Sequence, residues 1–135
     1  MVVDAGPLIA AALAGDADHE RCVRLLQGSS EPLQVPALAA AEAACFVGHR
    51  ISPAAELALG RAFAGSELFM EPVEPADWDR IVELMDRYVD LPLGMADASV
   101  IALAERLEAT QIATLDRRHF AAVRPRHVEA FQLLP

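Results

Sequence analysis

The feature that most limits the fold of this chain is a pair of short apolar segments that each end in an aspartate. Residues 1–3 lead into Asp4, and residues 111–115 lead into Asp116. Short apolar runs are typical of buried strands, and between these two runs apolar residues recur at helical spacing. Strands that alternate with helices predict an α/β fold with a mainly parallel sheet. Because ligands bind beyond the carboxyl ends of parallel strands, we expect both aspartates at one functional edge.

Turn and capping signals divide the rest of the chain into further elements. Ser52 and Pro53, for example, supply a capping hydroxyl and a first-turn proline. The predicted helices cover residues 6–13, 16–27, 36–47, 53–63, 75–89 and 97–107, with a short one around His119. The further predicted strands cover residues 33–35, 68–70 and 130–134. In the helix that begins at Pro75, the side chains expected to face the core are Trp78, Ile81, Val82, Met85 and Val89. No repeat or linker interrupts the pattern, so residues 1–135 are predicted to form a single domain.

Composition excludes several classes of protein. The longest apolar stretch, residues 35–47, is broken by Glu42 and is shorter than the roughly 20 residues of a membrane span. Asp4 interrupts the start of the chain, which argues against a signal peptide, so we expect a cytoplasmic protein. Cys22 and Cys45 have no cysteine or histidine at zinc spacing, and we expect both to be buried free thiols. The apolar fraction of 54% favours a subunit or partner interface and an alanine-rich core about equally.

Two further carboxylates stand where an isolated acid is unusual. Asp97 opens a helix, which places it near the carboxyl edge of the sheet. Glu42 is the only charged residue of the apolar stretch, and a carboxylate is rarely buried there without a partner. Each acid also has a plainer interpretation, the aspartates as helix caps or turn residues and Glu42 as the partner of an arginine. The set of four is the stronger signal if the fold gathers it.

Convergence of Asp4, Glu42, Asp97 and Asp116 would have a direct electrostatic consequence. Two carboxylates about 4 Å apart repel by roughly 4 kcal/mol at an effective dielectric constant near 20. Four of them require raised pKa values or a bound cation. The ligands would be oxygen atoms alone, a set that suits Mg²⁺ or Mn²⁺ and argues against zinc. Such an ion is typical of phosphodiester hydrolysis, in which it activates water and neutralises charge on the phosphate.

Four segments of the chain resemble the successive motifs of PIN domains, and most closely those of the bacterial VapC toxins of toxin–antitoxin pairs. They are residues 1–8 (MVVDAGPL), Glu42 within its helix, residues 95–104 (MADASVIALA) and residues 112–120 (IATLDRRHF). The resemblance covers essentially the whole chain. It implies a PIN-like three-layer α/β fold, with helices on both sides of a short central sheet, and the activity of a Mg²⁺-dependent endoribonuclease.

The same resemblance implies a role for each acidic residue. Asp4 and Asp97 are the expected metal ligands, while Glu42 and Asp116 complete the acidic pocket as ligands through water or as aids to the attacking water. Thr114 stands where the family often has a serine or threonine that supports the site. The family also implies a homodimer and a cognate antitoxin protein that blocks the pocket.

The basic residues near Asp116 bear on an RNA substrate. A formal charge of −9 argues against broad nucleic-acid binding. Arg117 and Arg118 follow Asp116 directly, and two interpretations are about equally strong: they steer an RNA backbone toward the metal, or they form a solvated helix turn. His119 and His127 have no partner at triad or metal spacing, so surface or packing roles are expected for both.

Three other classes of protein compete with this interpretation. A haloacid-dehalogenase-like phosphotransferase needs a second acid two positions after the first aspartate, where this chain has Gly6. A receiver-like signalling domain needs a lysine late in the chain, and all eleven basic residues here are arginines. A non-catalytic PIN-like protein that only binds its partner meets no such conflict, although the presence of all four acids counts against it.

Overall fold

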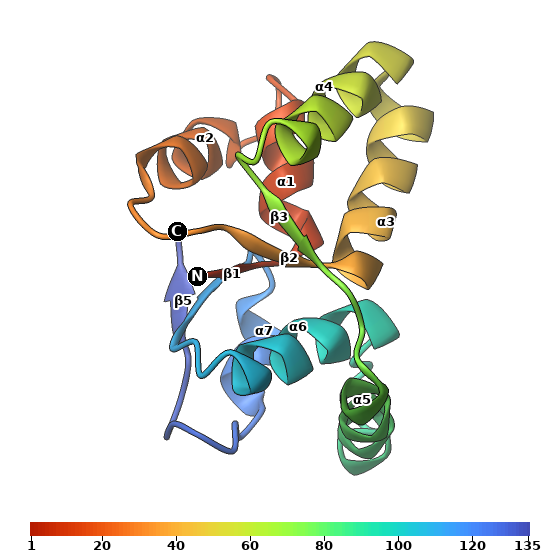
Figure 1. The fold of residues 1–135 in the computed structure, drawn as a ribbon, viewed down its shortest axis with the longest axis vertical. Helices are drawn as coiled ribbons and strands as arrows, with labels where there is room; N and C mark the ends of the chain where they lie inside the picture. The colour runs from red at the N-terminus through yellow and green to blue at the C-terminus, as the bar shows by residue number, and fades with distance from the viewer.

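The computed structural model describes residues 1–135 as a five-stranded sheet with helices on both faces (Figure 1). The strands are β1 (Val2–Val3), β2 (Gln34–Pro36), β3 (Phe69–Glu71), β4 (Gln111–Ala113) and β5 (Gln132–Leu134). Their order across the sheet is β3-β2-β1-β4-β5, and every pairing is parallel. The predicted α/β class is therefore confirmed, and the sheet is wholly parallel rather than mainly so.

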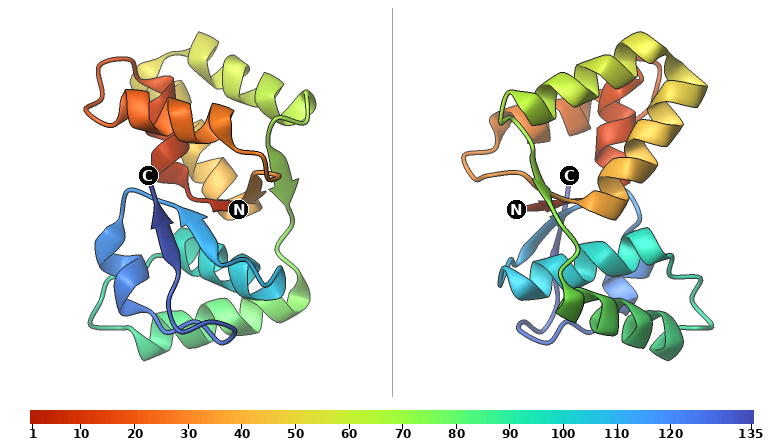
Figure 2. Two further views of the ribbon diagram at one scale, coloured as in Figure 1. Left: turned by 90° about the vertical axis from the view of Figure 1, so that its left-hand side faces the viewer. Right: turned by 45° about the vertical axis from the view of Figure 1, so that its right-hand side comes forward.

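The helices form two layers, one on each side of the sheet. They are α1 (Ala5–Ala12), α2 (His19–Gly28), α3 (Ala37–Phe46), α4 (Pro53–Ala64), α5 (Pro75–Arg87), α6 (Met95–Arg106) and α7 (Arg117–Ala122). The first four helices lie on one side and the last three on the other, in all three views (Figures 1 and 2). None of these helices is both long and apolar enough to cross a membrane.

The core lies where β1 and β4 meet the inner faces of the helices. Val2, Val3 and Ile112 are completely buried, as expected of strands that are covered on both faces. Residues 98–104 of α6 are all buried as well, since this helix is enclosed by β1, β2, α3 and α5. Asp4 directly follows β1, so the buried centre of the sheet fixes its position.

The predicted inner face of α5 is partly wrong. Ile81 is buried, but Trp78 is 42% exposed and Val82 is 63% exposed. The helix packs chiefly on α6 and so buries only one narrow stripe of residues. That stripe includes Arg80, whose guanidinium donates two 2.8 Å hydrogen bonds to Glu105 of α6. The stripe comprises Asp77, Arg80, Ile81 and Leu84, while the predicted Val89 lies beyond the end of the helix and is 75% exposed.

The prediction for the cysteines is correct for one of the two. Both thiols are free and Cys22 is fully buried, but Cys45 is exposed on the outer side of α3. Its Sγ lies 3.8 Å from Nδ1 of His49, one helical turn further on, so a histidine does stand nearby. The predicted helix over residues 36–47 also continues differently, because its last residue begins a π-helical turn, Val47–Ile51, that leads into α4.

Candidate active site

Asp4 is held on both carboxylate oxygens. Its Oδ1 accepts a 2.7 Å hydrogen bond from the backbone N–H of Ala5, as an N-cap of α1. Its Oδ2 accepts a 2.8 Å hydrogen bond from the Thr114 hydroxyl. Its own backbone N–H donates to the carbonyl of Ala113 on β4. The side chain is therefore fixed in one orientation at the carboxyl ends of β1 and β4.

Thr114 and Asp116 form the loop between β4 and α7. Thr114 is 1% exposed, and its Oγ1 also accepts a 3.0 Å hydrogen bond from the backbone N–H of Asp116. Asp116 is the N-cap of α7, with Oδ1 accepting a 3.0 Å hydrogen bond from the backbone N–H of His119. The threonine hydroxyl thus contacts the carboxylate of Asp4 and the backbone of Asp116.

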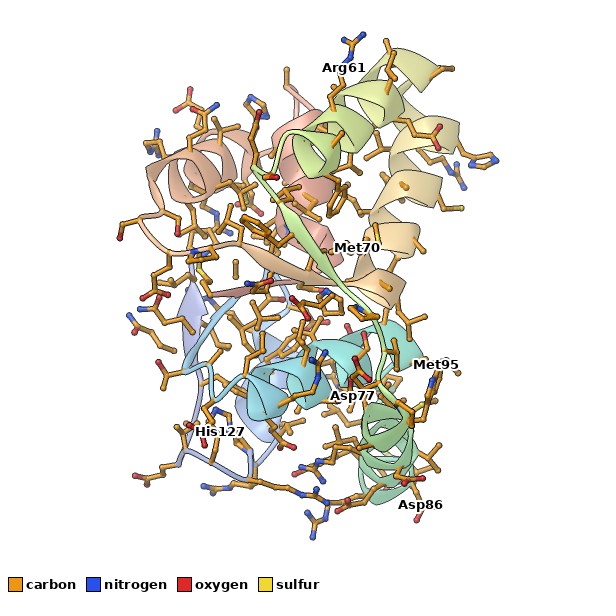
Figure 3. All side chains as sticks on the ribbon, viewed as in Figure 1. Arg61, Met70, Asp77, Asp86, Met95 and His127 are labelled. Atoms are coloured by element: carbon orange, nitrogen blue, oxygen red, sulfur yellow. The ribbon has the colours of Figure 1, made fainter.

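Asp97 stands in the first turn of α6. The backbone N–H of Gly94 donates a 2.9 Å hydrogen bond to Oδ2 of Asp97. A carboxylate in this turn also interacts favourably with the amino-terminal end of the helix dipole. Met95, which is labelled in Figure 3, marks this end of α6 at the edge of the molecule. The Asp97 carboxylate therefore caps the start of α6 and also lines the cavity described below.

Glu42 reaches the same region from the opposite helical layer. It lies on α3, which packs against α6, and its neighbour Ala43 is fully buried. The Glu42 side chain is exposed, and it forms no ion pair. The plainer interpretation of Glu42 as the partner of an arginine is therefore wrong.

One open cavity of about 630 Å³ brings these acids together. Its wall contains all four predicted carboxylates, Asp4, Glu42, Asp97 and Asp116. They come from β1, α3, α6 and the end of β4, four elements that only the tertiary fold can assemble. The carboxyl edge of the sheet is thus acidic, as the sequence predicts.

Burial and mutual repulsion raise the pKa values of three of these groups. Burial raises the pKa of Asp4 from 3.8 to about 6, against the lowering effect of the Thr114 and Ala5 hydrogen bonds. Desolvation also raises the pKa of Asp97, with the Gly94 hydrogen bond opposing it. The pKa of Glu42 is raised by desolvation and then by the charge of Asp97. A cation in this cavity would relieve each of these effects.

His119 also contacts the acids of the site, which the sequence analysis did not predict. Its Nδ1 lies 2.7 Å from Oδ2 of Asp116 and 3.8 Å from Oδ2 of Asp97. The predicted surface or packing role is therefore incomplete. The spacing of three residues from Asp116 within a helix was a local signal for one contact, but the contact with Asp97 depends on the tertiary fold.

His127 has the expected packing role, with Nε2 2.9 Å from the carbonyl of Ala109.

The two arginines after Asp116 also line the cavity, and both are exposed. Arg117 donates a 2.7 Å hydrogen bond to the carbonyl of Pro135, which ties it to the end of β5. The Arg118 side chain forms no hydrogen bond or ion pair within the chain. Its guanidinium is therefore available to an anionic ligand at the rim of the cavity.

The donor atoms of the cavity fit a hard divalent cation. Its acids offer only oxygen ligands, which Mg²⁺ and Mn²⁺ prefer. No three histidine, cysteine or acidic side chains lie close enough together to hold an ion by themselves. Mg²⁺ usually keeps several waters and takes only one or two carboxylates directly, so an open acidic cavity of this kind suits it.

Comparisons with known proteins agree with this geometry. A sequence model described as the PIN domain matches residues 1–124. The chain is 33% identical to Ribonuclease VapC26 of Mycobacterium tuberculosis strain H37Rv over 135 residues, which cover all of both chains. Among solved structures it resembles VapC20 of Mycobacterium tuberculosis, described as a sarcin-ricin loop cleaving toxin, with a TM-score of 0.83 and 20% identity over 95% of this chain and 98% of that one. It also resembles FitAcB of Neisseria gonorrhoeae, with a TM-score of 0.67 and 16% identity over 88% and 89% of the two chains.

Proposed function

The chain belongs to the PIN domain family, as its motifs predict, and we propose that it is a metal-dependent endoribonuclease. The observation that carries the proposal is the convergence of Asp4, Glu42, Asp97 and Asp116 on one open cavity. The relative that covers the whole chain is named a ribonuclease, which supports the same activity here. The family match also removes the haloacid-dehalogenase-like alternative.

In the proposed site, Asp4 and Asp97 hold Mg²⁺, or Mn²⁺, and Glu42 and Asp116 complete the acidic pocket. When bound, such an ion activates water and offsets negative charge that develops on the phosphate. Thr114 keeps the Asp4 carboxylate aimed at the cavity through its 2.8 Å hydrogen bond. The Gly94 N–H does the same for Asp97.

The proposed acceptor of a proton from the attacking water is Glu42, because it is the one acid of the four whose carboxylate no backbone N–H holds. Its pKa is raised by desolvation and by Asp97, which brings it closer to neutral pH, where a general base is most effective. It also lies on α3, apart from the three acids that are bound to backbone N–H groups. Its carboxylate is free to turn toward a water molecule.

Arg118 is the proposed contact for the RNA backbone. It is exposed, it lines the cavity, and nothing within the chain occupies its guanidinium. A guanidinium binds a phosphate through two parallel hydrogen bonds. Because the whole chain carries a charge of −9, a local positive group at the cavity rim is what an RNA strand would need in order to approach.

The proposed biological role is that of the toxin of a toxin–antitoxin pair. Support comes from the relatives, since VapC20 is described as a toxin and VapC26 shares a third of its residues with this chain. A cognate antitoxin that blocks the acidic pocket and a homodimeric state remain predictions from the family. Light scattering of the purified chain, alone and with the product of a neighbouring reading frame, tests both.

Incubation of the purified protein with total cellular RNA tests the activity. We expect discrete fragments with Mg²⁺ or Mn²⁺, none with EDTA, and none from the Asp97→Asn variant. The matched control is Asp86→Asn, because Asp86 is an exposed acid on α5 outside the cavity. Intact RNA in every lane, from a folded protein with metal present, would favour the alternative of a PIN-like protein that only binds its partner. The sarcin-ricin loop is the first target to inspect, because VapC20 is described as a toxin that cleaves this loop.

A further inference from the structure

We propose that His119 is a positioning residue that joins Asp116 to Asp97 and so sets the shape of the acidic cavity. This inference rests on the proposed metal-dependent function. The imidazole contacts one carboxylate from the β4–α7 loop and one from the first turn of α6. It would act through these two acids and not by touching the substrate.

The first argument is the number of contacts that His119 makes with Asp116. The backbone N–H of His119 donates to Oδ1, and the ring Nδ1 lies 2.7 Å from Oδ2. Both oxygens of this carboxylate are thus in contact with a single residue. The Asp116 side chain is 39% exposed, the most open partner in these contacts, whereas the His119 side chain is only 16% exposed. The backbone N–H holds Oδ1 whatever side chain stands at position 119, so the imidazole supplies the contact that fixes the second oxygen of Asp116.

The second argument is that His119 closes a chain of polar contacts around the cavity. Thr114 joins Asp4 to the backbone of Asp116, and Gly94 holds Asp97. The only ion pair or hydrogen bond between α7 and the first turn of α6 is the approach of His119 to Asp97, at 3.8 Å. Without the imidazole, the part of the site built on α6 would lose its polar connection to the part built on α7.

The third argument concerns the state of Nδ1. This nitrogen is buried and has no aligned hydrogen bond, although two carboxylate oxygens lie within 4 Å of it. Hydrogen bonds of catalytic sites often tighten only when the reactive complex forms. A neutral imidazole can carry its ring proton on Nδ1, so the contact requires no added charge. Phe120, the next residue, is 1% exposed and anchors α7, which keeps the ring in place.

Substitutions of His119 distinguish this role from simple packing. The amide nitrogen of asparagine reaches nearly the position of Nδ1, whereas phenylalanine keeps the ring and loses the nitrogen. We expect His119→Phe to weaken the binding of Mn²⁺ about 10-fold or more, in the range seen when partners of metal ligands are removed. We expect His119→Asn to recover most of that affinity. The control is His127→Phe, which removes a half-buried imidazole outside the cavity and is expected to leave Mn²⁺ binding unchanged.

Titration calorimetry of each full-length variant with Mn²⁺ alone is the primary measurement. Cleavage kinetics follow, and we expect His119→Phe to lower kcat about 10-fold or more while KM for RNA changes little. Wild-type affinity in His119→Phe would overturn the inference, as would an equal loss in the phenylalanine and asparagine variants. If the wild type binds Mn²⁺ but cuts no RNA, the proposed function fails while the calorimetry still decides the role of His119. A wild type that binds no Mn²⁺ would overturn both.

Discussion

Two hollows of this molecule lie at opposite edges of the same sheet. The acidic cavity, about 630 Å³, follows the carboxyl ends of β1 and β4. A larger groove, about 920 Å³, lies where β2 and β3 begin, and it is walled mainly by apolar residues of α1, α2 and α4. In parallel α/β sheets, the carboxyl edge is where ligands bind. Volume alone would favour the apolar groove over the cavity that holds the four acids.

The difference between the hollows lies in how polar groups are held. In the acidic cavity, backbone N–H groups at the starts of α1, α6 and α7 each donate to an aspartate. Parallel strands that lead into helices produce such N–H groups at every carboxyl end. The wall of the groove is mainly apolar, since 12 of its 19 residues are hydrophobic. We therefore expect charge, metal and pH to act on the acidic cavity and to have little effect on the groove.

The sharpest contrast between the two hollows compares the cleavage rate of Asp4→Asn with that of Leu59→Ala. Asn cannot supply the second anionic ligand of the proposed metal site, so we expect cleavage to fall by about 100-fold or more. Leu59 lies in the wall of the groove, and its truncation should change cleavage less than about 2-fold. Initial rates on a fixed RNA at saturating Mg²⁺ measure both. Equal losses in the two variants would mean that the acidic cavity has no special role.

The pH dependence of stability should follow Asp4 with an unusual sign. Folded Asp4 keeps its proton up to about pH 6, whereas the unfolded chain loses it near 3.8. Between these values the native state binds more protons, so the free energy of unfolding falls as pH rises, by about 3 kcal/mol for this group. Urea unfolding in EDTA from pH 4 to 7 measures it. The difference between wild type and Asp4→Asn isolates the effect of Asp4 from other acids, such as Glu83, whose pKa the adjacent Arg80 lowers despite an opposing desolvation effect.

We expect wild type to lose stability relative to Asp4→Asn between pH 4 and 6, and to regain it at pH 7 when Mg²⁺ is added. The Leu59→Ala variant should behave as wild type does. A wild type that becomes steadily more stable than Asp4→Asn over this range would contradict the assigned burial of Asp4 and weaken the contrast between the two edges.

Thr114→Val tests the support of Asp4 with almost no change of shape. Loss of the hydroxyl removes the hydrogen bond to Asp4 and the acceptor for the Asp116 N–H at once. We expect cleavage to fall about 10-fold or more. The metal-free protein should lose about 1–3 kcal/mol of unfolding free energy, because the hydroxyl is buried. Thr114→Ser, which keeps the hydroxyl, should retain most of the activity, and an equally poor serine variant would mean that the methyl group matters more.

The sequence predicted those site residues that a local pattern marks, and it missed the contacts that form only in the folded chain. Asp4 and Asp116 end apolar strands, and Asp97 opens a helix, so short stretches of sequence were sufficient. Glu42 stood out as the single charge in an apolar helix. His119 could not be placed in full, because its contact with Asp97 joins residues 22 positions apart on different helices. That contact depends on how α7 packs.

For the fold as well, the order of the elements was predicted better than the burial of individual side chains. The order of strands and helices followed from local patterns. The buried strands are short apolar runs, and capping or turn residues such as Ser52 and Pro53 mark where helices begin. The burial of Trp78 and Val82 was predicted wrongly, because it depends on what covers α5, which packs chiefly on α6 and is joined to the loop before β5 by the ion pair of Glu83 with Arg126. Arg80 can be buried in the inner stripe because Glu105 on α6 accepts two hydrogen bonds from its guanidinium. Asp77, labelled in Figure 3, is buried there for the same reason, beside Arg106.

The smallest expected effect lies in the groove itself. Leu59 is only partly buried, so its truncation to alanine should cost about 1 kcal/mol of unfolding free energy, less than the 2–5 kcal/mol of a fully buried leucine. Leu57, two residues earlier on the same helix and 57% exposed, is the matched control, with almost no expected cost. The increase in Tm caused by Mg²⁺ should be the same in both variants as in wild type, because the ion would bind at the other edge of the sheet. A reduced increase in Leu59→Ala alone would mean that the two hollows are coupled through α1, the helix that contributes residues to both walls.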